Sequence, residues 1–417
     1  MARILIHTLV FSPDGVSTAY LMSDLARELV RRGHRVVVLT TTPHYNAEPG
    51  SLARQPISPV WGSLLGRSDF NGIPVFHVTM PAKGRKLLAR AFDYVRFHLV
   101  SLAASVRTVG PYDIVIAPSP PLSIGVIAWL QGMMRSAPAV YNVQEIYPDF
   151  LIHQGLIRRG WQIATLRALE RFVYARSAMI VSISEWFART IVARGVPREK
   201  VTVIPNFVDA ELYRPLPRQN PFARAHGLAE SFTVLYAGNL GLSQDWDSVL
   251  HAAEQLRTKP ILFALVGDGA RRAWLETEVE RRRLANVRLL GYQSRELMPE
   301  INASSDVGTI PMKHTSTSDT FPSKIYTIMA CGKPVVVSAD PDSELAWLVQ
   351  EAACGQVVLP EDPVAYTDAI ARAFADRQGL AGAGARGREF VARRYSKEIV
   401  GEAYARLVEG MLGCHSE

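Results

Sequence analysis

The sequence predicts an α/β protein made of two doubly wound domains, each a mostly parallel sheet with helices on both faces. Apolar, β-branched runs alternate with amphipathic helical stretches along most of the 417 residues. This alternation breaks once, over residues 207–230, which hold three prolines and show no periodicity. A chain of this length has room for two or three domains of about 150 residues. We therefore expect domains over 1–206 and 231–395, joined by a linker over 207–230.

The first domain opens with a strand, a turn and a helix. Residues 4–11 are apolar without alternation, as in a strand buried on both faces. Leu21, Leu25 and Leu29 recur at helical spacing, and Arg31-Arg32-Gly33 ends that helix before a second buried strand over 36–40. This βαβ unit implies a parallel sheet. The same pattern predicts strands near 113–121, 139–144, 179–184 and 201–206, with helices over 124–134, 161–176 and 185–194.

The second domain repeats the alternation. Buried strands are predicted near 233–238, 261–269, 287–292, 306–312, 334–339 and 355–360. Residues 396–417 predict an amphipathic helix that packs back on the first domain. Ligands of such sheets bind beyond the carboxyl ends of the strands. We therefore expect the two domains to face each other across a cleft that holds the site.

Composition and charge exclude several classes of protein. A hydrophobic share of 48% with 20% charged residues is that of a globular chain, not of a disordered or fibrous one. Residues 1–200 hold 23 basic and 12 acidic side chains, and the whole chain has a net charge of +7. This asymmetry indicates an anionic partner or a solvated basic face. Basic residues are not interleaved with aromatic ones, so a nucleic-acid partner is not expected.

The cysteines and the amino terminus predict a reducing compartment. Cys331, Cys354 and Cys414 are odd in number and lack C-x-x-C spacing, so neither a disulfide framework nor a zinc site is expected. No signal peptide is recognised after Met1, and no apolar run reaches the ~18 residues of a spanning helix. The expected location is the cytoplasm.

Residues 83–105 predict an amphipathic helix with an unusual second face. One stripe is apolar and predicted to enter the core: Leu88, Ala91, Val95, Leu99 and Leu102. The other is basic and then aromatic: Lys83, Lys86, Arg90, Tyr94 and Phe97. Such a face suits an anionic membrane surface. A solvated helix with extended cations is the alternative.

Two positions in the first domain are candidate site residues. Gly15 follows the first strand, where a glycine lets backbone amides approach an anion. It is a single glycine without the acidic residue of a dinucleotide site, which argues against a redox cofactor. Glu145 follows a buried strand and suits a general base or an orienting carboxylate, with a structural carboxylate as the alternative. Asp149 is expected to cap the next helix.

In the second domain three strand-end segments are candidates. Gly238 and a second glycine follow the first strand and suit close approach to a phosphate, with Asn239, Ser243 and Gln244 as hydrogen-bonding neighbours. Gly267, in Val-Gly-Asp-Gly, marks a similar but weaker turn.

The segment 315–337 is the most informative. Pro322 is predicted to begin a helix with Lys324 in its first turn, where a lysine opposes the helix dipole unless an anion binds. Free amides and Lys324 would hold a pyrophosphate, and Thr327 would reach a sugar hydroxyl.

These motifs resemble the family-4 glycosyltransferases of GT-B fold, whose two domains are Rossmann-like. The resemblance rests on the glycine turn and GHRVVVLT of the first domain, and on YAGNLG, LVGDG and FPSKIYTIMACGKPVV of the second. VQE and FPSK make the chain most similar to the WbuB-like branch of bacterial surface-polysaccharide enzymes.

The resemblance implies a retaining, metal-independent transfer from a nucleotide-sugar, with no cofactor. The donor, UDP-linked by family frequency, would bind the second domain, and a lipid-linked or saccharide acceptor the first. Lys324 and Ser323 would lie near the diphosphate and Tyr292 near the base. Two glutamates common in relatives are Asp319 and Thr327 here, a histidine after the fourth strand is replaced by Gln144-Glu145, and an arginine and a lysine by Asn239 and Gln244. The enzyme is expected at the inner face of the plasma membrane.

Two other functions fit the same sequence. A nucleotide-sugar epimerase shares the fold and would interconvert its substrate without an acceptor. A non-catalytic, membrane-docked partner subunit is the second alternative, for which Thr327 in place of glutamate is the strongest argument.

Overall fold

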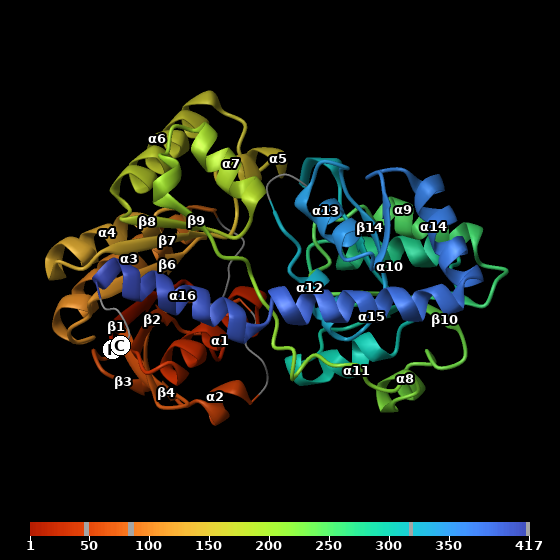
Figure 1. Ribbon diagram of the computed structural model, residues 1–417, viewed down its shortest axis with the longest axis horizontal. Helices are drawn as coiled ribbons and strands as arrows, with labels where there is room; N and C mark the ends of the chain where they lie inside the picture. The colour runs from red at the N-terminus through yellow and green to blue at the C-terminus, as the bar shows by residue number, and fades with distance from the viewer. Residues whose placement is uncertain (46–49, 82–86, 317–319, 414–417) are drawn as a thin grey trace. The chain divides into compact units, whose positions relative to one another are not determined.

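The fold was analysed in a computed structural model, which describes residues 1–45, 50–81, 87–316 and 320–413. The chain divides into two compact units (Figure 1). Unit 1 comprises Met1–Pro148, Arg158–Asn206 and Lys397–Glu417, and unit 2 comprises Asp149–Ile157 and Phe207–Ser396. The chain is thus mixed α/β with two Rossmann-like halves.

Unit 1 holds, within the described residues, a nine-stranded sheet in the order β3-β4-β5-β2-β1-β6-β7-β8-β9. In this spatial order, all strands from β5 through β2 and β1 to β9 run parallel to one another. At the other edge, β4 pairs antiparallel with β5, and β3 pairs antiparallel with β4. The central strands are apolar on both faces, which is why they read as continuous hydrophobic runs. The strands are β1 (Arg3–His7), β2 (Arg35–Thr41), β3 (Ser58–Pro59), β4 (Leu65–Phe70), β5 (Ile73–Val78), β6 (Ile114–Pro118), β7 (Ala139–Val143), β8 (Met179–Ser182) and β9 (Val201–Val203).

Helices cover both faces of this sheet, and the last helix of the chain belongs to it. In α16, Gly401 lies so close to α1 that a Cβ there would meet the Cβ of Glu28 at 2.8 Å. A larger residue would force the two helices apart. The helices are α1 (Ser17–Arg31), α2 (Ser51–Arg54), α3 (Leu87–Arg107), α4 (Ile124–Arg135), α6 (Gly160–Arg176), α7 (Glu185–Ala193), η1 (Arg198–Lys200) and α16 (Lys397–Leu412).

Unit 2 contains a parallel six-stranded sheet in the order β12-β11-β10-β13-β14-β15 among its described residues. The order reverses between β10 and β13, which makes this the switch point of the sheet. Its strands are β10 (Phe232–Ala237), β11 (Ile261–Val266), β12 (Val287–Leu290), β13 (Val307–Pro311), β14 (Val335–Ser338) and β15 (Gly355–Val358). Its helices are α5 (Asp149–His153), α8 (Pro221–Ala225), α9 (Trp246–Gln255), α10 (Arg272–Arg281), η2 (Arg295–Leu297), α11 (Met298–Ala303), η3 (His314–Ser316), α12 (Lys324–Ala330), α13 (Glu344–Glu351), α14 (Pro363–Ala375) and α15 (Arg377–Arg394).

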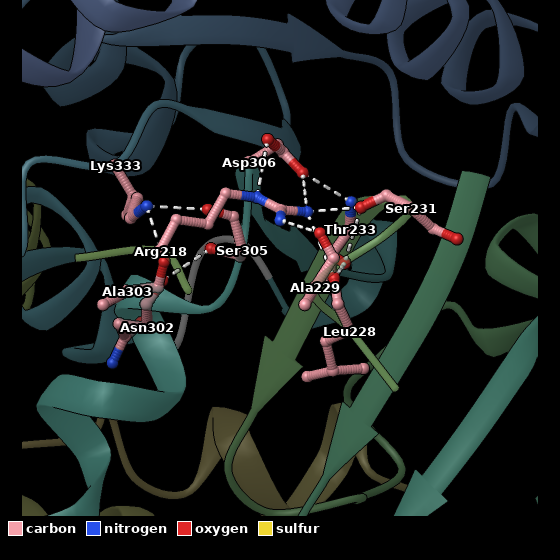
Figure 2. Close-up of polar contacts among 10 residues, drawn as sticks. All are labelled: Arg218, Leu228, Ala229, Ser231, Thr233, Asn302, Ala303, Ser305, Asp306 and Lys333. Atoms are coloured by element: carbon pink, nitrogen blue, oxygen red, sulfur yellow. Dashed lines mark hydrogen bonds and ion pairs between the residues drawn. The ribbon is translucent and has the colours of Figure 1, made fainter. Parts of the chain in front are cut away.

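Residues 207–230, predicted as a linker, pack into unit 2. Figure 2 shows Arg218 reaching the amino end of the sheet, where Asp306 accepts hydrogen bonds from its Nε at 3.0 Å and Nη2 at 2.7 Å. The same guanidinium donates to the carbonyl oxygens of Leu228, Ala229 and Ser231. This ion pair and the buried Phe222 make the segment part of the domain. Prolines broke the sequence periodicity here without preventing packing.

Lys333 is held in the same region and has no place in the candidate site. Its Nζ donates to the carbonyl oxygens of Ala303 at 2.8 Å and Ser305 at 2.7 Å (Figure 2). Burial lowers its pKa to about 8. The lysine therefore closes the carboxyl end of α11.

The two faces predicted for the helix over 83–105 are wrong where the structure describes them. Phe97, predicted on the exposed face, is fully buried, whereas Val95 and Leu99, predicted in the core, are 53% and 65% exposed. The buried face of α3 continues through Ser101 and Ala104, small residues whose low hydrophobicity hid them from the pattern. Lys83 and Lys86 lie outside the described residues.

No helix within the described ranges has the length and apolar character needed to cross a membrane. Cys331 and Cys354 are buried free thiols in unit 2, and burial raises the pKa of each to about 12. Cys414 lies outside the described residues.

Candidate functional site

The loops after β10 and β13 meet at the switch point of unit 2. The backbone N–H of Asp245 donates to the carbonyl oxygen of Pro311 at 2.8 Å, and that of Lys313 donates to Ser243 at 2.9 Å. Gln244 forms an antiparallel bridge with Met312. These bonds fix the two loops at the carboxyl edge of the sheet, where open α/β sheets bind their ligands.

Lys324 is held at this edge by an aromatic ring. Its Nζ lies 3.7 Å from the ring centroid of Tyr236, which is fully buried at the end of β10. The Tyr236 hydroxyl donates to the carbonyl oxygen of Asn239 at 2.6 Å, and its ring packs edge-on against Trp246 at 4.8 Å. A rigid aromatic ring favours the charged ammonium above its face. The lysine head is thus fixed beside the loop that follows β10.

Among the residues that the structure describes, no acidic side chain neutralises the charge of Lys324. Burial lowers its pKa to about 7. A lysine in this position is half charged near neutrality, and an anion beside it restores the full charge.

Glycines bring two backbone segments together next to this lysine. A Cβ on Gly238 would lie 3.1 Å from the Nζ of Lys324. A Cβ on Gly267 would lie 1.9 Å from the carbonyl oxygen of Gly238. Both residues have positive φ, +140° and +137°, which glycine adopts without strain. The loops after β10 and β11 can therefore approach each other, while the N–H groups of Gly238 and Gly267 donate to the carbonyl oxygens of Val266 and Leu290.

The other predicted donor residues of unit 2 lie on the same edge or next to it. Asn239 is exposed, and the Gln244 side chain accepts a hydrogen bond from the Gly241 N–H at 3.0 Å. Tyr292 is 39% exposed after β12. Asp319 lies outside the described residues.

The start of α12 differs from the predicted one by two residues. The helix begins at Lys324, with Ser323 in the N-cap position, whereas Pro322 was predicted as its first residue. The Thr327 hydroxyl donates to the Lys324 carbonyl oxygen at 2.9 Å within this helix. The Thr327 hydroxyl proton is therefore already donated within the helix. The sequence predicts instead that this hydroxyl reaches a sugar hydroxyl.

Glu145 and Gly15 belong to unit 1. Gly15 is buried between β1 and α1. Glu145 follows β7, beside Tyr147, which hydrogen-bonds to its carboxylate. Burial raises the pKa of Glu145 to about 7. Such a carboxyl group exchanges a proton near neutral pH, as a general base does. Asp149 begins α5, in unit 2.

Tyr236 is the residue that sequence reasoning missed. It appeared only as an apolar member of a buried strand. Its position two residues before Gly238-Asn239 was the available signal, because the end of a strand at the switch point borders the ligand site.

Comparisons with known proteins agree with this architecture. Residues 18–206 match the family described as "Glycosyl transferase 4-like domain", and residues 231–376 match "Glycosyl transferases group 1". The chain is 26% identical over 365 residues to WcaI of Escherichia coli (strain K12), a protein named for a colanic acid biosynthesis glycosyl transferase, covering 84% of this chain and 86% of WcaI. It is 30% identical over 173 residues to the alpha-galactosylglucosyldiacylglycerol synthase of Streptococcus pneumoniae, covering 39% of this chain and 44% of that protein.

Two solved structures share the fold over nearly the whole chain. HepE of Anabaena in complex with UDP-glucose superposes with a TM-score of 0.74 at 19% identity, covering 98% of this chain and 100% of HepE. Sucrose-phosphate synthase of Thermosynechococcus elongatus superposes with a TM-score of 0.78 at 18% identity over 100% of both chains. With both halves matched and the fold shared over nearly the whole chain, the chain belongs to the family-4 glycosyltransferases of GT-B fold.

Proposed function

We propose that this glycosyltransferase moves a sugar from a UDP-linked donor to a lipid-linked or saccharide acceptor in surface-polysaccharide assembly. The transfer would retain the anomeric configuration and require no metal ion. The acceptor class is supported by the colanic acid name of WcaI, and the nucleotide by the UDP-glucose complex of HepE. No cofactor is included, since the nucleotide-sugar is a co-substrate.

The observation that carries the proposal is the position of Lys324. Its ammonium lies over Tyr236 at the switch point, beside the loop at Gly238. A diphosphate placed there would meet this cation directly. A cation in this position favours a charged diphosphate over a neutral sugar.

The same groups would stabilise the leaving nucleotide. When the sugar–oxygen bond breaks, negative charge develops on the β-phosphate. Lys324 and the amides at the start of α12 are fixed before the reaction, so they stabilise this charge without reorganisation. Such preorganised donors contribute several kcal/mol to catalysis, about 3 kcal/mol for one donor.

Retention follows if the acceptor attacks the face that the nucleotide leaves. The acceptor hydroxyl forms the new bond to the anomeric carbon, and its proton passes to the departing phosphate oxygen. Glu145 would orient the hydroxyl and accept a hydrogen bond from it. No enzyme nucleophile is needed in this scheme.

The two shifted pKa values predict a bell-shaped pH dependence of kcat/KM. Glu145, whose pKa is raised to about 7, becomes protonated as the pH falls, so activity should decline on the acid side. Lys324, whose pKa is lowered to about 7, loses its charge as the pH rises, so activity should decline on the alkaline side. Since kcat/KM reports the free enzyme, initial rates between pH 5 and 9 at low donor concentration measure this. Glu145→Gln should remove the acid limb, and a flat wild-type profile would contradict both roles.

Donor binding tests the proposed function itself. At a concentration of 100 times its Kd, a ligand stabilises the folded state by about 2.7 kcal/mol, so UDP and UDP-sugars should raise the melting temperature and GDP should not. Incubation with the stabilising UDP-sugar and a lipid-linked acceptor should then give a glycosylated product. Interconversion of the sugar nucleotide without acceptor would instead identify an epimerase. Absence of any nucleotide effect would favour the non-catalytic subunit.

An anionic membrane is the proposed docking surface for α3. Phe92, Val95, Leu99 and Val106 recur at helical spacing and are 41–70% exposed. Arg107 is exposed on the same helix, and unit 1 is the basic part of the chain. An exposed apolar stripe with flanking cations suits insertion among anionic headgroups. This face would place the enzyme at the inner side of the plasma membrane.

Liposome binding tests whether this exposed face of α3 binds an anionic membrane. Full-length protein should sediment with vesicles of anionic phospholipid, with an affinity that falls as salt is raised. Leu99→Ser should weaken this binding several-fold through lost apolar burial. Val364→Ser removes a comparably exposed apolar side chain, 62% exposed in unit 2, and should leave binding unchanged. Equal effects of the two variants, or binding without salt dependence, would refute the assignment.

A further inference from the structure

A directional chain of hydrogen bonds runs from Asn206 to Tyr404 through Gln144, the residue before Glu145. The Asn206 amide Nδ2 donates to Gln144 Oε1 at 2.8 Å, and Gln144 Nε2 donates to Asn142 Oδ1 at 2.8 Å. Asn142 Nδ2 in turn donates to the hydroxyl oxygen of Tyr404. The backbone N–H of Gln144 donates to Ser119 Oγ at 3.0 Å. Gln144 and Asn142 therefore each donate through the amide nitrogen and accept through the amide oxygen.

Burial makes the hydrogen bonds of this chain costly to lose. Asn142, Asn206 and Tyr404 are 1%, 7% and 3% exposed. Buried amides without partners are costly, so reversing one of them would leave a donor facing a donor or an acceptor facing an acceptor. The chain thus holds Gln144 through both its side chain and its backbone. Glu145 is the next residue along.

The hydrogen-bond chain joins two of the segments at which the polypeptide passes from one unit to the other. Asn206 is the last residue of unit 1 before the polypeptide enters unit 2 for the second time, and Tyr404 lies in α16, shortly after the polypeptide returns at Lys397. On the unit 2 side the same two segments are paired, since the Val208 N–H donates to the Tyr395 carbonyl oxygen at 2.9 Å. Hydrogen bonds therefore connect these two segments both in unit 1 and in unit 2.

We propose that Gln144 is a positioning residue, and that the chain from Asn206 to Tyr404 holds the backbone of Glu145 in a fixed relation to these two passages. The inference rests on the proposed role of Glu145. It adds that the position of this carboxylate depends on segments distant in sequence. A change at either passage would then alter the placement of the acceptor hydroxyl and leave the donor residues of unit 2 untouched.

Tyr404→Phe tests this with a single hydroxyl removed. Loss of one hydrogen bond in the chain should lower kcat about fivefold, while KM for the donor stays within about twofold. Hydrogen exchange at the amides of 144–147 should become about fivefold faster. Tyr366→Phe is the matched control, because this fully buried phenol in unit 2 also bonds one hydroxyl, that of Thr309 at 2.7 Å. It should alter thermal stability alone.

Gln144→Met provides the second variant, since it keeps the side-chain length at a partly exposed position and removes both the acceptor oxygen and the donor nitrogen of the amide. It should reproduce the kcat loss and the faster exchange even where Tyr404→Phe proves unstable. The proposal is overturned if both variants keep wild-type kcat and exchange, or if Tyr366→Phe gives the same changes. If the proposed function is wrong, the wild-type protein will transfer no sugar. Hydrogen exchange at 144–147 in the variants would still decide whether the hydrogen-bond chain holds this loop.

Discussion

Replacing Lys324 with alanine is expected to lower kcat by two to three orders of magnitude, about 3–4 kcal/mol of transition-state stabilisation. The ammonium is the cation fixed over Tyr236 at the switch point, and the leaving diphosphate gains charge during the reaction. The fold should remain intact, because burial already disfavours this charge in the free protein. Steady-state rates with saturating donor, together with the melting temperature, measure both statements.

Lys259→Ala is the control for this substitution. Lys259 is exposed in unit 2, away from the strand ends of the candidate site, so its loss should change neither kcat nor stability. A Lys324→Ala enzyme with wild-type kcat would show that the lysine does not face the leaving group. A large fall in melting temperature would instead assign it a structural role.

Gly267→Ala is expected to have the largest effect on stability. A Cβ there would lie 1.9 Å from the Gly238 carbonyl oxygen, and the residue has a φ of +137°. Overpacking and backbone strain together should reduce the free energy of unfolding by about 3 kcal/mol, a fall in melting temperature of about 10 °C. The displaced loop should also weaken UDP binding. Calorimetric melting with and without UDP measures both effects.

Gly291→Ala separates this mechanism from a general cost of replacing glycine. Gly291 follows the neighbouring strand β12, and a Cβ there would meet no atom within 4 Å. Its φ is not positive, so alanine should be tolerated with almost no loss of stability. If both alanine variants unfold at the wild-type temperature, the close approach of the two loops does not contribute to stability.

The sequence predicts the α/β class and both sheets because strands buried on both faces leave continuous apolar runs. The same logic failed for α3, whose buried face contains Phe97 and Ser101 while Leu99 is exposed. Hydrophobicity alone cannot tell a core stripe from an exposed apolar one. The linker prediction had a similar limit, since the ion pair of Arg218 with Asp306 joins residues 88 positions apart.

The candidate site was predicted as a set of strand-end positions, not as a geometry. Lys324 was recognised because a cation opposes the dipole at a helix start. Its contact with Tyr236 depends on two segments distant in sequence, which spacing does not show. The family is confirmed by the matches to both halves, while the WbuB-like branch, the donor and the acceptor stay predictions.

A crystal structure of the protein with UDP is the most direct test of the central claim. The account predicts the β-phosphate within about 3 Å of the Lys324 Nζ, with the diphosphate between the Gly238 loop and the start of α12. A diphosphate bound elsewhere, with Lys324 still resting on Tyr236 and contacting no phosphate oxygen, would contradict it.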